Sequence, residues 1–126
     1  MKIAFATDDG KHVDTHFGYT ESFDIYDISK EKYEKVQTRV VSCAREISEN
    51  NRIDYRINRI VDCKLLFITQ IGPAAAARVT RNKIMPIKVK EGTLIQEQLD
   101  RLLLLLQSKP PLWLAKALNS EKESKL

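Results

Sequence analysis

The sequence contains few of the residues that build small disulfide-linked or metal-clipped folds. Its 126 residues include two cysteines, Cys43 and Cys63, four glycines, four prolines and two histidines. The two cysteines are not spaced as CxxC, which excludes zinc ribbons and thioredoxin-like redox motifs. Two cysteines are also too few for a disulfide framework, so we expect free thiols in a reducing compartment.

Long hydrophobic runs are absent as well. The longest purely apolar run, residues 102–106, is far shorter than the ~20 residues that a membrane-spanning helix needs. The apolar run at residues 3–6 is too short for the hydrophobic region of a signal peptide. The sequence therefore predicts a cytoplasmic protein that does not associate with membranes.

The composition fits one soluble domain, with 43% hydrophobic and 30% charged residues. Charge is unevenly distributed along the chain. Residues 1–63 contain 10 Lys and Arg against 12 Asp and Glu, whereas residues 64–126 contain 11 against 5. A basic half indicates either an anionic partner or an ordinary solvated surface, and charge alone favours the second interpretation.

The first part of the chain has the pattern of three strands. Residues 1–7 are almost continuously apolar, which is typical of a central strand covered on both faces. Residues 21–28 and 33–41 are rich in β-branched and aromatic side chains, and the short polar turn at residues 29–31 makes them an antiparallel hairpin.

The second part alternates helices and strands. An apolar stripe with helical spacing predicts a helix over residues 52–61, with an N-cap at Asn50 or Asn51. Residues 64–71 form a second central strand. Pro73 then opens a helix, because proline suits the first helical turn.

A short strand over residues 85–90 follows, and Pro86 places it at a sheet edge. Gly92 precedes the last long helix, for which Thr93 and Gln96 form a predicted capping box. The stripe of that helix consists of Ile95, Leu99, Leu102 and Leu106.

This order predicts a single α/β domain over residues 1–107, with a mixed five-stranded sheet, an N-terminal antiparallel hairpin and helices on both faces. Residues 108–126 form a tail with a short apolar helix around Trp113. The tail either folds back on the domain or docks on a partner.

If strands 1–7 and 64–71 are parallel neighbours, their carboxyl ends form a crevice of the kind in which open α/β sheets bind ligands. Two loops meet there, residues 8–19 and 69–72. The second loop opens a helix at Gly72, whose free N–H groups favour an anion. Close packing of the following alanines against the sheet explains the same residues equally well.

The first loop carries both histidines. His16 is a candidate metal ligand because imidazole binds iron well, although a loop-ordering role is equally compatible. His12 is more simply an exposed side chain, and Asp8 and Asp9 are more simply turn residues. Cys43 lies beside a predicted surface loop and is the better candidate for a reactive thiolate.

Cys63 fits a small buried hydrophobic residue. Three arginines, Arg52, Arg56 and Arg59, share one helix stripe. They form either a solvated face, which is the default interpretation, or an anion-binding surface.

Several segments resemble the dinitrogenase iron–molybdenum cofactor biosynthesis family. The residues that carry the resemblance are 2–7, 13–18 with the sequence Val-Asp-Thr-His-Phe-Gly, 23–26, 71–79 and 86–92. The tail at residues 110–118 is similar to that of the NifX branch of the family. Together these segments span nearly all of residues 1–118.

The resemblance implies a ribonuclease H-like fold and no catalysis. It implies a carrier for NifB-co, the iron–sulfur precursor of the nitrogenase cofactor, received from NifB and exchanged with the NifEN scaffold, with no nucleic acid as partner. By this resemblance His16 is a cluster ligand or close contact, and Cys43 and Cys63 are candidate ligands. Gly72, at the start of its helix, is the second candidate for binding the cofactor.

Two other functions are compatible with the residues. In a metal-dependent nuclease, Asp8 would lie at the end of the first strand, as a two-metal carboxylate does. The strand at residues 64–71, however, carries no second carboxylate. The other alternative is an interaction module that acts through the tail and binds no cluster.

Overall fold

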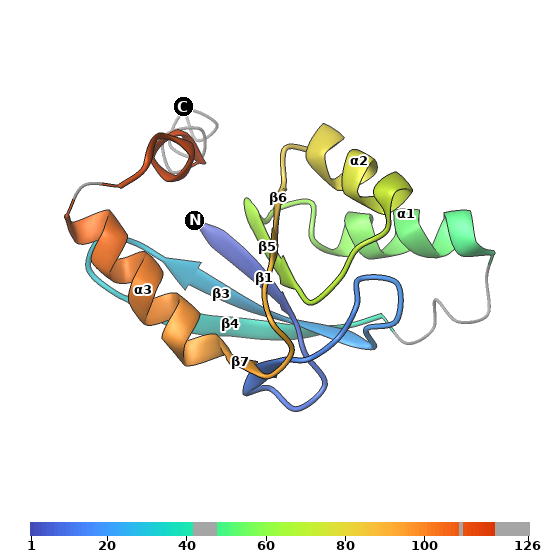
Figure 1. The fold of residues 1–126 in the computed structure, drawn as a ribbon, viewed down its shortest axis with the longest axis horizontal. Coiled ribbons are helices and arrows are strands. Elements are labelled where there is room, and N and C mark those ends of the chain that lie inside the picture. Colours follow the sequence, from blue (N-terminus) through green and yellow to red (C-terminus); the bar gives the residue numbers. More distant parts are fainter. Residues whose placement is uncertain (42–47, 109, 118–126) are drawn as a thin grey trace.

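The protein folds around one mixed sheet that separates two helical layers (Figure 1). The computed structural model describes residues 1–41, 48–108 and 110–117. The five-stranded sheet has the order β4-β3-β1-β5-β6, which confirms the predicted mixed sheet. Its strands are β1 (Lys2–Ala6), β3 (Ser22–Ile28), β4 (Tyr33–Val40), β5 (Leu65–Ile68) and β6 (Met85–Lys88).

β1 lies at the centre of the sheet, as its apolar sequence predicts. It pairs antiparallel with β3, which continues antiparallel into β4, and it pairs parallel with β5, which continues parallel into β6. The predicted hairpin is therefore present, and the parallel pairing of the two central strands, on which the predicted crevice depends, is present as well. β1 is the strand at which the direction of the sheet changes.

The alternating side chains of β1 separate the two hydrophobic cores. Ala4 and Ala6 face the layer of α1 (Glu49–Arg59) and α2 (Pro73–Arg81). Ile3 and Phe5 face α3 (Ile95–Gln107) on the other side. The helices thus cover both faces of the sheet, and Figure 1 shows α1 and α2 on one side of it and α3 on the other.

α1 begins earlier than its apolar stripe predicts. Its N-cap is Ser48, whose hydroxyl oxygen accepts a hydrogen bond from the N–H of Asn51 at 3.4 Å. The prediction of an N-cap at Asn50 or Asn51 is therefore wrong. Ser48 precedes the first apolar residue of the stripe by more than a turn, so periodicity alone does not find it.

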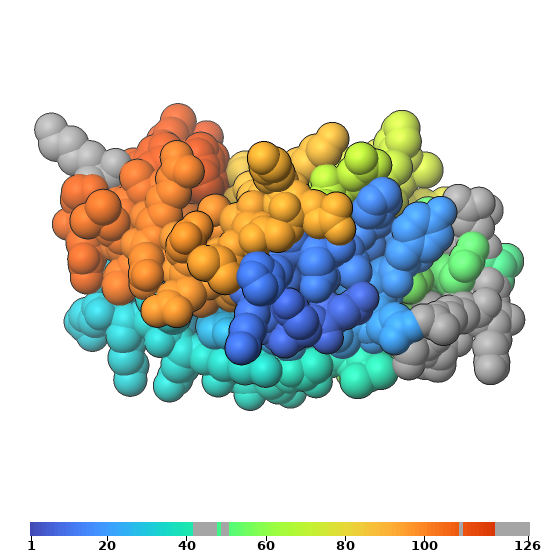
Figure 2. Space-filling model, turned by 60° about the horizontal axis from the view of Figure 1, so that its bottom comes forward, coloured from blue at the N-terminus to red at the C-terminus, as the bar shows by residue number. Residues whose placement is uncertain are grey.

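The predicted capping box of α3 is also wrong. Thr93 belongs to β7 (Thr93–Leu94), which pairs antiparallel with β2 (His12–Val13), and α3 starts only at Ile95 without a side-chain cap. Gly92 has the positive φ of 87° that suits glycine, and it forms the turn that enters β7. Figure 2 shows the resulting contact between the blue N-terminal loop and the orange segment that leads into α3.

The chain after α3 returns to the domain. Residues 112–117 are helical, and Leu114 is completely buried in the core beneath α3. Trp113 and Ala117 pack against the same core, whereas Leu112 is 71% exposed. Within residues 1–41, 48–108 and 110–117, no helix has the length and apolar character needed to cross a bilayer.

Candidate functional site

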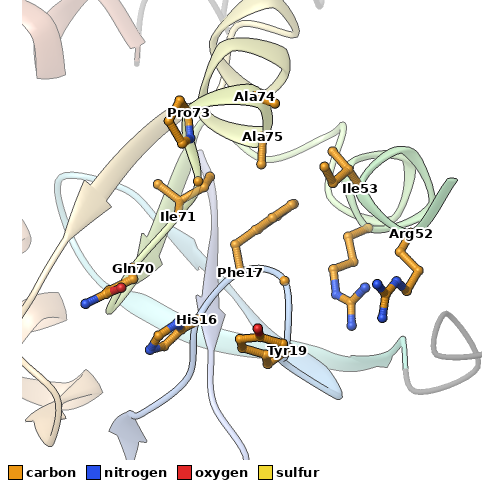
Figure 3. Close-up of a pocket in the computed structure, with 13 residues that line it drawn as sticks. His16, Phe17, Tyr19, Arg52, Ile53, Gln70, Ile71, Pro73, Ala74 and Ala75 are labelled. Carbon is orange, nitrogen blue, oxygen red and sulfur yellow. The ribbon is translucent and has the colours of Figure 1, made fainter. Parts of the chain in front are cut away.

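A pocket of about 580 Å³ lies at the carboxyl ends of β1 and β5. Both predicted loops line it, through residues 16–19 and 70–75. Its third wall, which the sequence did not predict, comes from Arg52, Ile53 and Arg56 of α1. Figure 3 shows the side chains of these three walls, with Phe17 between the loops and the two helices.

Backbone hydrogen bonds join the two loops. The N–H of Phe17 donates to the carbonyl of Gln70 at 2.9 Å, and the N–H of Thr69 donates to the carbonyl of Thr15 at 3.2 Å. The Phe17 side chain is completely buried and contacts the ring of Phe23. The loop that carries His16 is therefore fixed from both its backbone and its neighbouring side chain.

His16 lies at the rim of this pocket. Its carbonyl oxygen accepts hydrogen bonds from the N–H groups of Tyr19 and Thr20, which close a tight turn. The imidazole is exposed and lies beside the ring of Tyr19, with 5.6 Å between ring centroids. An exposed imidazole at a rigid rim is available to a ligand in the pocket.

Two arginines of α1 give the pocket positive charge. The side chain of Arg56 is only 2% exposed, and its Nη2 donates to the carbonyl of Thr20 at 2.9 Å. Arg52, one turn earlier, is half-buried and also lines the pocket. The default interpretation of this stripe as a solvated face is wrong for Arg56, whereas Arg59 is exposed.

The N-terminus of α2 completes the positive side of the pocket. Gly72 is the N-cap, Pro73 occupies the first turn as predicted, and no acidic residue lies in that turn. A Cβ added at Gly72 would meet no atom within 4 Å, so the space beside it is open. The helix dipole and the unpaired N–H groups of the first turn attract an anion to such a place.

Cys63 lies at the opposite end of the sheet from His16. It precedes the amino end of β5, where its N–H donates to the carbonyl of Ile60 at 2.9 Å. Burial raises the pKa of the Cys63 thiol to about 12, with the nearby carboxylate of Asp62 as the next cause. The structure therefore does not bring Cys63 and His16 together. Cys43 lies outside the described residues.

His12 is placed away from the pocket, in β2. Its Nδ1 lies 2.6 Å from Oδ2 of Asp9. Asp9 also accepts from the N–H groups of Lys11 and His12, which confirms its predicted role in a turn. These hydrogen bonds, that of the His12 ring first, hold the pKa of Asp9 well below its ordinary value.

The described lining of the pocket contains no carboxylate. In the described part of the chain, no three His, Cys, Asp or Glu side chains come together as a metal site. The pocket offers one imidazole, two guanidinium groups and a helix N-terminus, together with the neutral side chains of Tyr19 and Gln70, around an apolar floor. This set suits a bulky anionic ligand that needs few direct bonds to protein.

The fold and the pocket define a class of protein: an open α/β sheet with a ligand site at the strand where its direction changes. Residues 1–104 match the sequence profile described as dinitrogenase iron-molybdenum cofactor. The chain belongs to this family. Within it the chain is NifX-like, since it is similar to curated NifX proteins along most of its length.

Protein NifX of Herbaspirillum seropedicae is 33% identical over 124 residues, which cover 98% of this chain and 85% of that protein. Protein NifX of Sinorhizobium fredii is 36% identical, covering 94% of this chain and 78% of that protein. Protein NifY of Klebsiella pneumoniae is 38% identical over 94% of this chain, but the match spans only 51% of that longer protein.

Solved structures show the same fold. The apo form of the orange protein from Desulfovibrio gigas superposes with a TM-score of 0.65 at 17% identity, covering 83% of this chain and 88% of that one. The structure of PH0822 superposes with a TM-score of 0.64 at 23% identity, covering 82% and 90%. At these identities the likeness concerns the fold alone.

Proposed function

We propose that this protein is a non-catalytic carrier in the biosynthesis of the nitrogenase iron–molybdenum cofactor. It binds an iron–sulfur precursor, NifB-co or a related cluster, in the pocket beside His16. It receives the cluster from NifB and passes it to the NifEN scaffold. Membership of the family supports the place in cofactor biosynthesis, and the pocket supports the kind of cargo.

The observation that carries the proposal is the position of His16 on the rim of a pocket in which both charged side chains of the described lining, Arg52 and Arg56, are cationic. Clusters with bridging sulfides and negative charge are stabilised by guanidinium groups and by hydrogen bonds to sulfur. A single imidazole adds one exchangeable bond to iron. A carrier needs few ligands, because it has to release its cargo.

Cys43 is the thiol that we propose as a second contact. Val41, two residues earlier, is buried, and its N–H donates to the carbonyl of Glu21 at 2.7 Å. Glu21 follows Thr20, which Arg56 binds at the pocket. The described chain ahead of Cys43 ends at Val41, which is hydrogen-bonded to the residue next to Thr20, whereas the other thiol, Cys63, is buried.

No observation favours a nuclease at this site. A two-metal reaction needs carboxylates around both metal ions, and β5 and the described lining of the pocket provide none.

We also propose that the fold is ribonuclease H-like. It rests on the sheet order and on the antiparallel position of β3.

The proposal is tested by anaerobic incubation of the purified protein with isolated NifB-co, followed by gel filtration and iron analysis. We expect iron to elute with the protein and the protein to become brown. Added NifEN that lacks its cluster should then take up the iron. Folded protein that elutes without iron would contradict the carrier function, and iron that stays bound in the presence of NifEN would contradict delivery to it.

A further inference from the structure

A second groove lies on the other side of the sheet, away from the His16 pocket. It has a volume of about 450 Å³ and opens between β6, α3 and the tail. Phe67, Leu102 and Leu105 line its apolar part, and Trp113 of the tail lines it as well. None of these residues lines the His16 pocket.

The charged residues that line this groove are all cationic. They are Lys88, Lys90 and Arg101, each of which is exposed, and the described lining includes no carboxylate. Glu97 lies one helical turn before Arg101, but it is not part of the lining. An apolar groove with only positive charge around it is complementary to an acidic partner with an apolar anchor.

β6 adds a backbone edge to the groove. The N–H groups of Met85 and Val89 donate to carbonyls of the β5 side of the sheet. Because strand backbone groups alternate in direction, the N–H and C=O of Lys88, which lies between them, point away from β5. β6 is the last strand of the five-stranded sheet, so no strand of the described residues lies beside this edge.

We propose that this groove binds an extended acidic segment of a partner protein. The segment adds along the free edge of β6 at Lys88, and an apolar side chain of the segment enters the groove beside Trp113. Strand addition of this kind draws affinity from main-chain hydrogen bonds and specificity from side-chain pockets. Pro86, which has no N–H, limits the added strand to a few residues.

Lysines and a proline on an edge strand also have a simpler use, since they prevent association with other strands. The groove distinguishes the two interpretations. Edge protection needs no apolar cavity, whereas the lining here joins an aromatic ring from the tail with leucines from α3. The tail that folds back on the domain thus contributes to the surface that a partner would contact.

The experiment is selection of a phage-displayed library of random 12-residue peptides on the whole protein. The same library is first depleted on the variant Lys88→Ala/Lys90→Ala/Arg101→Ala. We expect the enriched peptides to combine Asp or Glu with a large apolar residue. Trp113 is the only tryptophan of the chain, so titration with a synthetic copy of such a peptide should shift its fluorescence.

The triple variant should bind that peptide about tenfold more weakly, as the loss of three exposed charge pairs implies. The matched control Lys30→Ala/Lys32→Ala/Arg81→Ala removes the same charge elsewhere and should bind like the wild type. In an added strand, only every second N–H of the peptide faces β6. N-methylation of those residues should therefore abolish binding, whereas N-methylation of the residues between them should not. Thermal melting confirms that both variants are folded.

Three outcomes would overturn the proposal. The first is a selection without enrichment above the triple variant, which leaves edge protection as the use of these residues. The second is enrichment of peptides without carboxylates. The third is binding of a small aromatic anion, with ATP as the probe, that shifts the Trp113 fluorescence while no peptide does.

Discussion

The N–H of Phe17 donates to the carbonyl of Gln70 at 2.9 Å and ties the loop after β1 to the loop after β5. Because the side chain of Phe17 is buried in the core, its neighbour His16 is held at the pocket rim without being part of the core. The position of His16 is thus set by the backbone of its loop and by the Phe17 side chain, not by contacts of its own imidazole with the core. Replacement of the His16 side chain therefore tests the site without removing what holds the loop.

Replacement His16→Ala should lower the amount of cluster retained after anaerobic loading. The fold should remain, because substitutions of exposed side chains usually change the free energy of unfolding by less than about 0.5 kcal/mol. The matched control is His12→Ala, since His12 lies in β2 outside the pocket. Equal iron retention by the two variants would remove His16 from the site.

The two arginines of the pocket should respond differently to replacement. Arg56→Ala leaves the buried carbonyl of Thr20 without its donor, which costs about 1–3 kcal/mol of unfolding free energy. Arg52→Ala, at a half-buried position, should change stability little and reduce cluster retention. Urea denaturation and iron analysis of both variants test this. A stable Arg56→Ala protein would contradict the structural role of that side chain.

The two thiols should also be distinguishable. In the variant Cys43→Ser, the remaining Cys63 should react slowly with iodoacetamide at pH 8, because burial raises its pKa to about 12. Unfolding in urea should make it reactive. We expect Cys43→Ser to reduce cluster retention and Cys63→Ser to lower the melting temperature instead. Full retention by both variants would show that the carrier needs neither thiol.

The crevice was predictable because the strands and the helix that form it are each recognisable from a short segment of sequence. Two apolar runs identify β1 and β5 as central strands, and Pro73 marks the start of α2. The burial of Arg56 was not predictable, since a charged residue on a helix normally faces solvent. Its partner, the carbonyl of Thr20, lies 36 positions away. The pairing of β2 with β7 was also not predictable from the sequence, because a strand of two residues is too short to show an alternating pattern.

Acid should weaken one ion pair of the fold. Arg39 binds Asp62 through two hydrogen bonds of 2.6 and 2.8 Å, and this contact lowers the pKa of Asp62. A lowered native pKa contributes stability above the unfolded value of about 3.9, and that contribution is lost as the pH falls through the native pKa.

Asp62→Asn should therefore destabilise the protein at pH 7, by about 0.5–1 kcal/mol because the pair is partly exposed to solvent. The difference from wild type should be smaller at pH 2, where more of the native Asp62 carboxyl is protonated. Asp54→Asn is the control, since its contact with Arg78 is a longer one of 3.3 Å and should contribute less. Urea denaturation at both pH values gives the comparison, and a constant difference would contradict the assignment.

The tail offers a pair of leucines as a test of its packing. Leu114 is completely buried and Leu112 is 71% exposed. Leu114→Ala should cost about 2–5 kcal/mol, whereas Leu112→Ala should be nearly neutral. Truncation after Ser108 should lower the melting temperature in the same way as Leu114→Ala. Unchanged melting of the truncated protein would mean that the tail serves only a partner.

The pairing of β2 with β7 has a consequence for the order in which the protein forms during synthesis. His12 and Val13 pair with Leu94 and Thr93. The N-terminal loop can therefore form this pairing only after the ribosome has synthesised a segment about 80 residues further along the chain. Contacts between such distant segments form slowly, because a long stretch of chain must be closed first. A ribosome-bound chain that ends before β7 cannot form this pairing. The loop between β1 and β3 is therefore completed only after residues 93–94 have been synthesised.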